Sequence, residues 1–223
     1  PFLPVSKADM EARGWDWYDF LIVNGDAYVD HPSFGGVVIA RTLEAEGYRV
    51  AFLPQPDWHS ADAFLAMGKP RLAVMLSSGN LDSMVAHYTA AKKRRRQDAY
   101  SPGYQTGLRP DRAVIVYANR VREAFSDTPL IIGGLEASLR RFAHYDYWSN
   151  QVRRAILFDA RADLLIYGMG EAATLEIAAQ LNAGVPVSDI TTVRGTSFAA
   201  REREACVYPW VEVPSYEEVK ADK

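Results

Sequence analysis

The chain has a single cysteine, Cys206, among its 223 residues. One thiol forms no disulfide within the chain, and an iron–sulfur cluster or a cysteine-rich zinc site needs several sulfur ligands. No apolar run approaches the length of a membrane span, and the N-terminus lacks the basic region and apolar run of a signal peptide. These absences predict a cytoplasmic protein with no membrane segment.

A strong net charge is also missing. The 25 Lys and Arg residues are opposed by 28 Asp and Glu residues, so the net charge of −3 gives no overall attraction to nucleic acid or anionic lipid. Hydrophobic residues make up 48% of the chain and charged residues 24%, which is typical of a packed domain and excludes a disordered protein. The length corresponds to one large domain.

Short apolar runs alternate with helical patterns along the chain. The predicted strands are residues 20–23, 48–53, 72–76, 130–132 and 164–167, and the clearest helical patterns are 36–46, 61–67, 110–125 and 172–183. Strands that are apolar on both faces and alternate with helices predict an α/β fold. We expect a doubly wound, five-stranded, mostly parallel sheet of flavodoxin-like or cobalamin-binding-like order 2-1-3-4-5.

The other segments carry weaker signals. Residues 84–88 suggest a helix that runs into the basic residues 92–96, and residues 136–160 form an aromatic loop or broken helix. Its residues 140–148 either fold over the strand ends as a lid, pack against a second domain or close the sheet edge. Residues 1–195 are predicted to form one Rossmann-like domain. Residues 196–223 read as an irregular tail, either a linker or the entry to a further domain.

Glycine and small polar residues follow the predicted strands. In doubly wound sheets ligands bind beyond the carboxyl ends of the strands, where glycine lets the backbone approach a ligand closely. The predicted cofactor-binding residues are therefore Asp26, Asp30, His31, Ser77, Ser78, Gly79, Gly133, Gly134, Glu136, Gly168, Gly170 and Glu171. The alternative is that these residues only form tight turns. No catalytic or metal-ligating residue is assigned.

The loop after the first predicted strand carries two carboxylates and an imidazole. Asp30 is placed to hold His31 in one tautomer, which would leave the other ring nitrogen for a metal or for proton transfer. Alternatively, an Asp of this loop caps the helix that follows, with Pro32 near the helix start. A small hydrolase using Asp30 and His31 is thus one alternative function.

Two further patterns have competing interpretations. Residues 168–173 match the dinucleotide spacing G-x-G-x-x-A, but the carboxylate of Glu171 favours a neutral polar group over a pyrophosphate. Residues 92–122 contain nine basic side chains against two acidic ones, either a solvated helix face or a nucleic-acid-binding module. The second reading is another alternative function, although nucleic acid is not the favoured partner.

Several longer motifs resemble one family. The runs GDAYVDHPSFG at 25–35, QPDW at 55–58, GNLDSM at 79–84, RPDR at 109–112 and GGLEASLRRFAHYDYW at 133–148 are similar to the N-terminal region of the YgiQ family of radical-SAM proteins. The resemblance implies a longer protein whose downstream barrel binds a 4Fe–4S cluster and S-adenosylmethionine through a CxxxCxxC motif absent from this chain. The chain itself would be a fragment that is inactive alone.

The resemblance also implies a role for the chain. It looks like the Rossmann-type domain that precedes the barrel in cobalamin-dependent radical-SAM enzymes. The expected function is therefore that of an accessory domain, which presents a ligand, with cobalamin as a candidate, or a partner to the downstream radical-SAM domain. The cobalt-ligating motif of such domains has Asp, one spacer, His, two spacers and Gly, whereas Asp30 and His31 are adjacent here and Gly35 lies four residues beyond His31.

Overall fold

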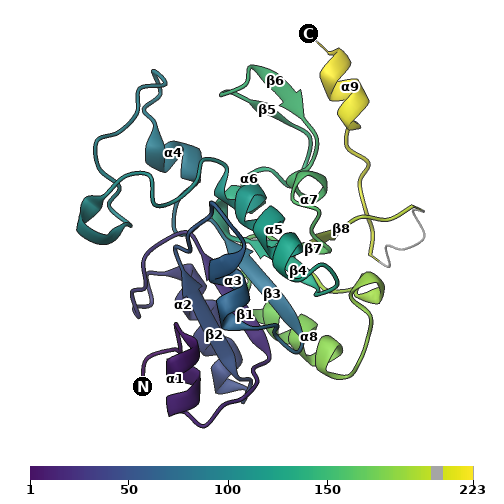
Figure 1. Ribbon diagram of the computed structural model, residues 1–223. Helices are drawn as coiled ribbons and strands as arrows, with labels where there is room; N and C mark the ends of the chain where they lie inside the picture. The colour runs from purple at the N-terminus through teal and green to yellow at the C-terminus, as the bar shows by residue number, and fades with distance from the viewer. Residues whose placement is uncertain (202–207, 223) are drawn as a thin grey trace.

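The computed structural model describes residues 1–201 and 208–222. Its main sheet has six strands in the order β2-β1-β3-β4-β7-β8 (Figure 1). These strands are β1 (Phe20–Asn24), β2 (Val50–Pro54), β3 (Ala73–Ser77), β4 (Leu130–Gly133), β7 (Leu164–Ile166) and β8 (Thr196–Phe198). The first five pair in parallel, which confirms the predicted class and order, and β8 adds an antiparallel edge strand.

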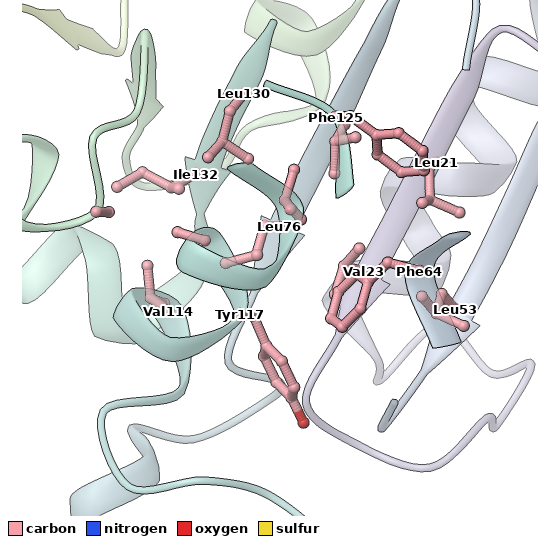
Figure 2. Packing of buried hydrophobic residues seen from close by; sticks show 14 of the residues in the cluster. Leu21, Val23, Leu53, Phe64, Leu76, Val114, Tyr117, Phe125, Leu130 and Ile132 are labelled. Atoms are coloured by element: carbon pink, nitrogen blue, oxygen red, sulfur yellow. The ribbon is translucent and has the colours of Figure 1, made fainter. Parts of the chain in front are cut away.

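Alternate strand residues face two separate apolar clusters, as the side-chain period of two requires. On one face, strand residues such as Leu21 and Val23 pack under α3 (Asp62–Met67), α5 (Ala113–Ala124), α6 (Gly134–Leu139) and α7 (Ile156–Asp159). Figure 2 shows this cluster, in which Phe64 of α3 and Tyr117 of α5 meet the strand side chains. On the other face, α2 (Gly35–Ala45) and α8 (Glu171–Asn182) cover the sheet.

The remaining elements flank this three-layer arrangement. They are α1 (Lys7–Ala12), α4 (Ser83–His87), the 3-10 turns η1 (Pro102–Tyr104) and η2 (Val187–Asp189), the strands β5 (His144–Asp146) and β6 (Gln151–Arg153), and α9 (Tyr216–Ala221). Met10 of α1 and Val187 of η2 pack against the core of the three layers. The antiparallel pair β5–β6 projects past the main sheet, beyond the carboxyl end of β4 (Figure 1).

Three segments differ from the expectation. The predicted helix at 84–88 does not reach the basic residues, because α4 ends at His87 and Tyr88 forms a β-bridge with Arg94. The aromatic segment 136–160 is neither a long loop nor one broken helix, since it contains α6, the β5–β6 hairpin and α7. The tail beyond residue 195 supplies β8, which completes the sheet edge, and α9.

Candidate functional site

A pocket of about 390 Å³ opens at the carboxyl ends of β1, β3, β4 and β7, between the first turns of α2 and α8. Seven of the twelve predicted site residues line it: Ser77, Gly79, Gly133, Gly134, Gly168, Gly170 and Glu171. Its floor consists of apolar strand residues, namely Ile22, Met75, Ile131 and Ile166. The volume and the apolar floor are those of a small-molecule site.

The rim of the pocket is polar and is fixed by cross-links between loops. The side-chain amide of Asn80 donates to the carbonyl oxygen of Ser33 at 2.9 Å, and its Oδ1 accepts from the Gly35 amide at 3.3 Å. Thr174 and the side chain of Glu171 complete the rim on α8. Two helix N-termini favour a ligand oxygen here, but the Glu171 carboxylate repels an anion, so a neutral amide or hydroxyl fits best.

The glycines of this edge serve different purposes. A Cβ at Gly79 would lie 2.0 Å from Oδ1 of Asp26, and one at Gly134 would lie 2.4 Å from Oγ of Ser77, so close packing requires both glycines. Gly168 adopts a φ of +72°, which favours glycine, and a Cβ built at this position would have no atom within 4 Å. Glycine is therefore required here by the backbone conformation of the turn and not by close packing. The tight-turn alternative therefore explains part of the glycine signal.

Asp26 and Ser78 do not line the pocket, because both contact the buried guanidinium of Arg109. Arg109 Nη1 donates to Oδ1 of Asp26 at 2.7 Å and to the Ser78 carbonyl oxygen at 3.0 Å. Burial raises the pKa of Asp26 to about 6, while the Asn80 amide and Arg109 oppose this rise. Through Arg109 and the Asn80 amide, the buried Asp26 carboxylate therefore connects the loop after β1 to the loop after β3.

The Arg109 contacts continue into a buried polar network. Arg109 Nη2 donates to both carboxylate oxygens of Asp98, at 2.9 and 2.7 Å. Nearby, the buried ring of His87 pairs through Nδ1 with Asp111 at 2.6 Å, and the Tyr88 hydroxyl donates to the same carboxylate at 2.7 Å. Sequence reasoning missed this network, because Arg109 counted only as one member of a basic segment.

Glu136 is also buried beneath the surface and does not line the pocket. Its two carboxylate oxygens accept from the Ser83 amide at 2.8 Å and from the Val114 amide at 3.0 Å. Burial raises the pKa of Glu136, and the two amide hydrogen bonds oppose the rise. This carboxylate holds the first turns of α4 and α5 together.

Asp30 and His31 lie on the exposed loop before α2, outside the pocket lining. Asp30 forms an ion pair with Arg41, which lowers the pKa of the Asp30 carboxyl, and it also accepts from the Tyr28 hydroxyl. Nδ1 of His31 accepts from the Ser33 amide at 3.1 Å. Asp30 thus neither orients His31 nor caps α2, whose N-cap residue is Phe34 with no side-chain cap.

The nine basic residues of segment 92–122 separate into two groups. Arg109 is buried, and ion pairs join Arg112 to Asp146, Arg120 to Glu123 and Arg122 to Asp163. Residues 92–96 remain exposed. The local charge excess that the sequence indicates is therefore confined to this short run.

Two further findings concern metals and membranes. Within residues 1–201 and 208–222, no group of three or more His, Cys, Asp or Glu side chains is arranged to hold a metal ion. Cys206 lies outside the described residues. Among the helices that the structure describes, none combines the length and apolar character of a membrane span.

Comparisons with known proteins show the family to which the chain belongs. The Radical SAM N-terminal family matches residues 2–223. The chain is 54% identical over 222 residues to UPF0313 proteins of Clostridium botulinum (strain 657 / Type Ba4) and of Geobacter sulfurreducens, and it covers 35% and 37% of their lengths. It is 54% identical over 215 residues to a UPF0313 protein of Pseudomonas aeruginosa, covering 96% of this chain and 28% of that protein.

The alignments with the Clostridium botulinum and Geobacter sulfurreducens proteins include the whole of this chain. The chain nevertheless spans only about a third of the length of those relatives. The matching family covers nearly every residue. The chain belongs to the Radical SAM N-terminal family.

Proposed function

We propose that this chain is the accessory domain of a longer radical-SAM enzyme. It binds a small ligand in the pocket at the carboxyl edge of the sheet and presents it to a downstream catalytic domain. The pocket carries this proposal, because its apolar floor and cross-linked polar rim form a preorganised small-molecule site. A cytoplasmic location belongs to the same proposal. So does a domain boundary, which lies after β8 rather than at residue 195 because β8 pairs with β7 in the main sheet.

The 4Fe–4S cluster and S-adenosylmethionine belong to the downstream domain in this proposal. A cluster of that type is held by several thiolates, whereas this chain has one cysteine. The residues present do not fit an iron–sulfur cluster, so the chain contributes ligand binding and orientation, and no redox step is assigned to it.

The pocket fits one chemical class of ligand best. Ile22, Met75 and Ile131 provide a surface for a flat apolar ring. Ser77, Asn80 and Glu171 line the same pocket with hydrogen-bonding groups suited to neutral amides or hydroxyls. A corrinoid has both features, and when bound it supplies radical chemistry that protein side chains lack.

A histidine-ligated cobalt does not fit this loop. Nδ1 of His31 accepts a hydrogen bond from the Ser33 amide, so a neutral ring carries its proton on Nε2 and offers no free lone pair to a metal. Asp30, the neighbouring carboxylate, is held by Arg41. We therefore propose that cobalamin binds without a histidine ligand from this chain.

Purification of the full-length protein without oxygen tests this function. We expect the absorbance spectrum to show an iron–sulfur cluster together with a corrinoid. Ile39 of α2 lines the pocket, so Ile39→Trp should narrow it and weaken corrinoid retention, while the iron–sulfur absorbance stays. Ala45→Trp is the control, because Ala45 is exposed on the same helix and does not line the pocket. Equal retention by both variants, or no corrinoid after reconstitution, contradicts the ligand assignment.

The alternative hydrolase gains no support from the geometry. It requires Asp30 to orient His31, and Asp30 instead contacts Arg41 and Tyr28. Neither residue lines the pocket in which a substrate would bind.

A further inference from the structure

A second surface of the molecule carries an uncompensated positive charge. Lys92, Lys93, Arg94, Arg95 and Arg96 are all exposed, and none forms an ion pair with any residue in the described ranges 1–201 and 208–222. They lie on the loop that follows α4 (Figure 1). The chain as a whole is acidic, so this run is a local feature with a charge opposite to that of the whole molecule.

Three acidic side chains near this run already have partners outside it. Asp98 is held by the buried guanidinium of Arg109. Asp111 is bonded to His87 and accepts from the Tyr88 hydroxyl, and Asp146 pairs with Arg112. Arg94 lies close enough to Asp111 to help lower the pKa of that carboxyl, so its charge is partly compensated. The other four cations of the run face solvent with no ion pair in the described ranges.

Aromatic rings from the β5–β6 hairpin are interleaved with the basic side chains. Lys92 Nζ lies 4.5 Å from the centroid of the Tyr147 ring, and the Arg94 guanidinium carbon lies 5.8 Å from that of Tyr88. Trp148 contacts both rings, with centroid distances of 5.1 Å to Tyr88 and 5.4 Å to Tyr147. Tyr147 is 46% exposed, so part of its ring remains free for a ligand.

Backbone contacts hold this surface in one arrangement. The Tyr147 hydroxyl donates to the Ala90 carbonyl oxygen at 2.6 Å, which joins the hairpin to the basic loop. Within the loop, the Thr89 amide donates to the Lys93 carbonyl oxygen at 2.9 Å and the Arg95 amide to the His87 carbonyl oxygen at 2.7 Å. The cations are therefore presented by an ordered loop, which lowers the entropic cost of binding.

We propose that the basic–aromatic surface, formed by residues 92–96 with Tyr88, Tyr147 and Trp148, binds single-stranded nucleic acid. Cations bind the phosphates, and exposed rings stack with unpaired bases, which a duplex keeps inside its own stack. This surface is separate from the ligand pocket, since none of its residues lines that pocket. The proposal stands independently of the function proposed above.

Binding of fluorescein-labelled 12-nucleotide oligouridine to the full-length protein tests the role of charge. For single strands, the logarithm of the affinity falls with the logarithm of salt concentration by about 0.7 for each phosphate contacted. The triple variant Lys93→Gln, Arg94→Gln, Arg96→Gln should weaken binding at least tenfold at moderate salt and reduce this slope by about 2. Lys7→Gln, Lys69→Gln, Lys220→Gln removes the same charge elsewhere and should leave both values unchanged.

A second set of variants tests stacking. Tyr147→Leu should weaken oligouridine binding about fivefold or more, the size of one lost stacking contact. Tyr147→Phe keeps the ring but loses the hydroxyl bond to the Ala90 carbonyl oxygen, so it should weaken binding less than Tyr147→Leu does. Trp17→Leu, an exposed aromatic residue near α1, is the control and should have no effect. Circular dichroism of each variant checks that the fold is retained.

Three results would overturn the proposal. They are a wild-type affinity that does not depend on salt, equal losses in the two triple variants, and absence of binding at low salt. Absence of binding at low salt would favour a different role for this surface, namely contact with the part of the full-length protein that lies outside this chain.

Discussion

Arg109 shows how far the burial of one residue changes its role. Its side chain is 1% exposed and satisfies two carboxylates and a backbone carbonyl oxygen. A buried ion pair contributes little compared with a well-packed apolar group, but the loss of one partner leaves charges stranded in the interior. Arg109 therefore secures the loops after β1 and β3, which border the ligand pocket.

Replacement of Arg109 should be strongly destabilising. Arg109→Met keeps most of the side-chain volume but leaves Asp26 and Asp98 without their cation, so we expect a loss of about 3–5 kcal/mol in the free energy of unfolding. Lys69→Met is the matched control, because Lys69 pairs with Asp127 on the surface and its loss should cost less than about 1 kcal/mol. Urea denaturation of both variants measures the difference, and equal losses would contradict the role assigned to Arg109.

Single residues also mark the limit of what the sequence predicts. Ser77, Gly79 and Gly133 lie together at the pocket, because parallel strands bring their carboxyl ends to one edge. Asp26 and Glu136 were assigned to the same site, yet they are buried and bind internal groups. Sequence position shows that a carboxylate follows a strand, but not whether its side chain turns toward the ligand or toward the protein.

At the scale of elements, strong local patterns were predicted and weak ones were not. Strands β1, β2, β3, β4 and β7 are buried on both faces, and their apolar runs are recognisable without knowledge of their neighbours. The three-residue strands β5, β6 and β8 are only partly buried and depend on their antiparallel partners. β7 is equally short but fully buried, so it has the apolar run that identifies a strand, and the three partly exposed strands lack such a run.

Glu136 joins the first turns of α4 and α5, beside a direct hydrogen bond from the Ala113 amide to Ser83 Oγ at 3.0 Å. Glu136→Ala leaves the Ser83 and Val114 amides buried without acceptors, and each unsatisfied donor costs about 1–3 kcal/mol. We expect thermal unfolding to show a loss of about 2 kcal/mol or more. Glu171→Ala, at the start of α8, removes a carboxylate that caps no amide of the described chain and should change stability by less than about 0.5 kcal/mol. A similar loss in both variants would contradict this role for Glu136.

At the scale of the whole molecule, one edge of the sheet carries the features that point to function. The pocket opens there, and large apolar side chains around it remain exposed, with Leu135 at 43% and Met169 at 91%. A second hollow of about 610 Å³ lies at the amino ends of β1 and β3, lined by residues such as Trp17 and Gly68, and it has no role in the proposed function. The relatives are about three times as long as this chain, and in the proposed function this edge is the face that meets the downstream domain.

Hydrogen–deuterium exchange tests this central claim most directly, by comparing the 223-residue chain with the full-length protein. The account predicts slower exchange in the full-length protein at residues 133–139 and 168–174, which follow β4 and β7, and unchanged exchange at residues 68–72 and 126–129, which precede β3 and β4. Protection of the amino-end loops alone, or identical exchange at the pocket edge in both proteins, would contradict it.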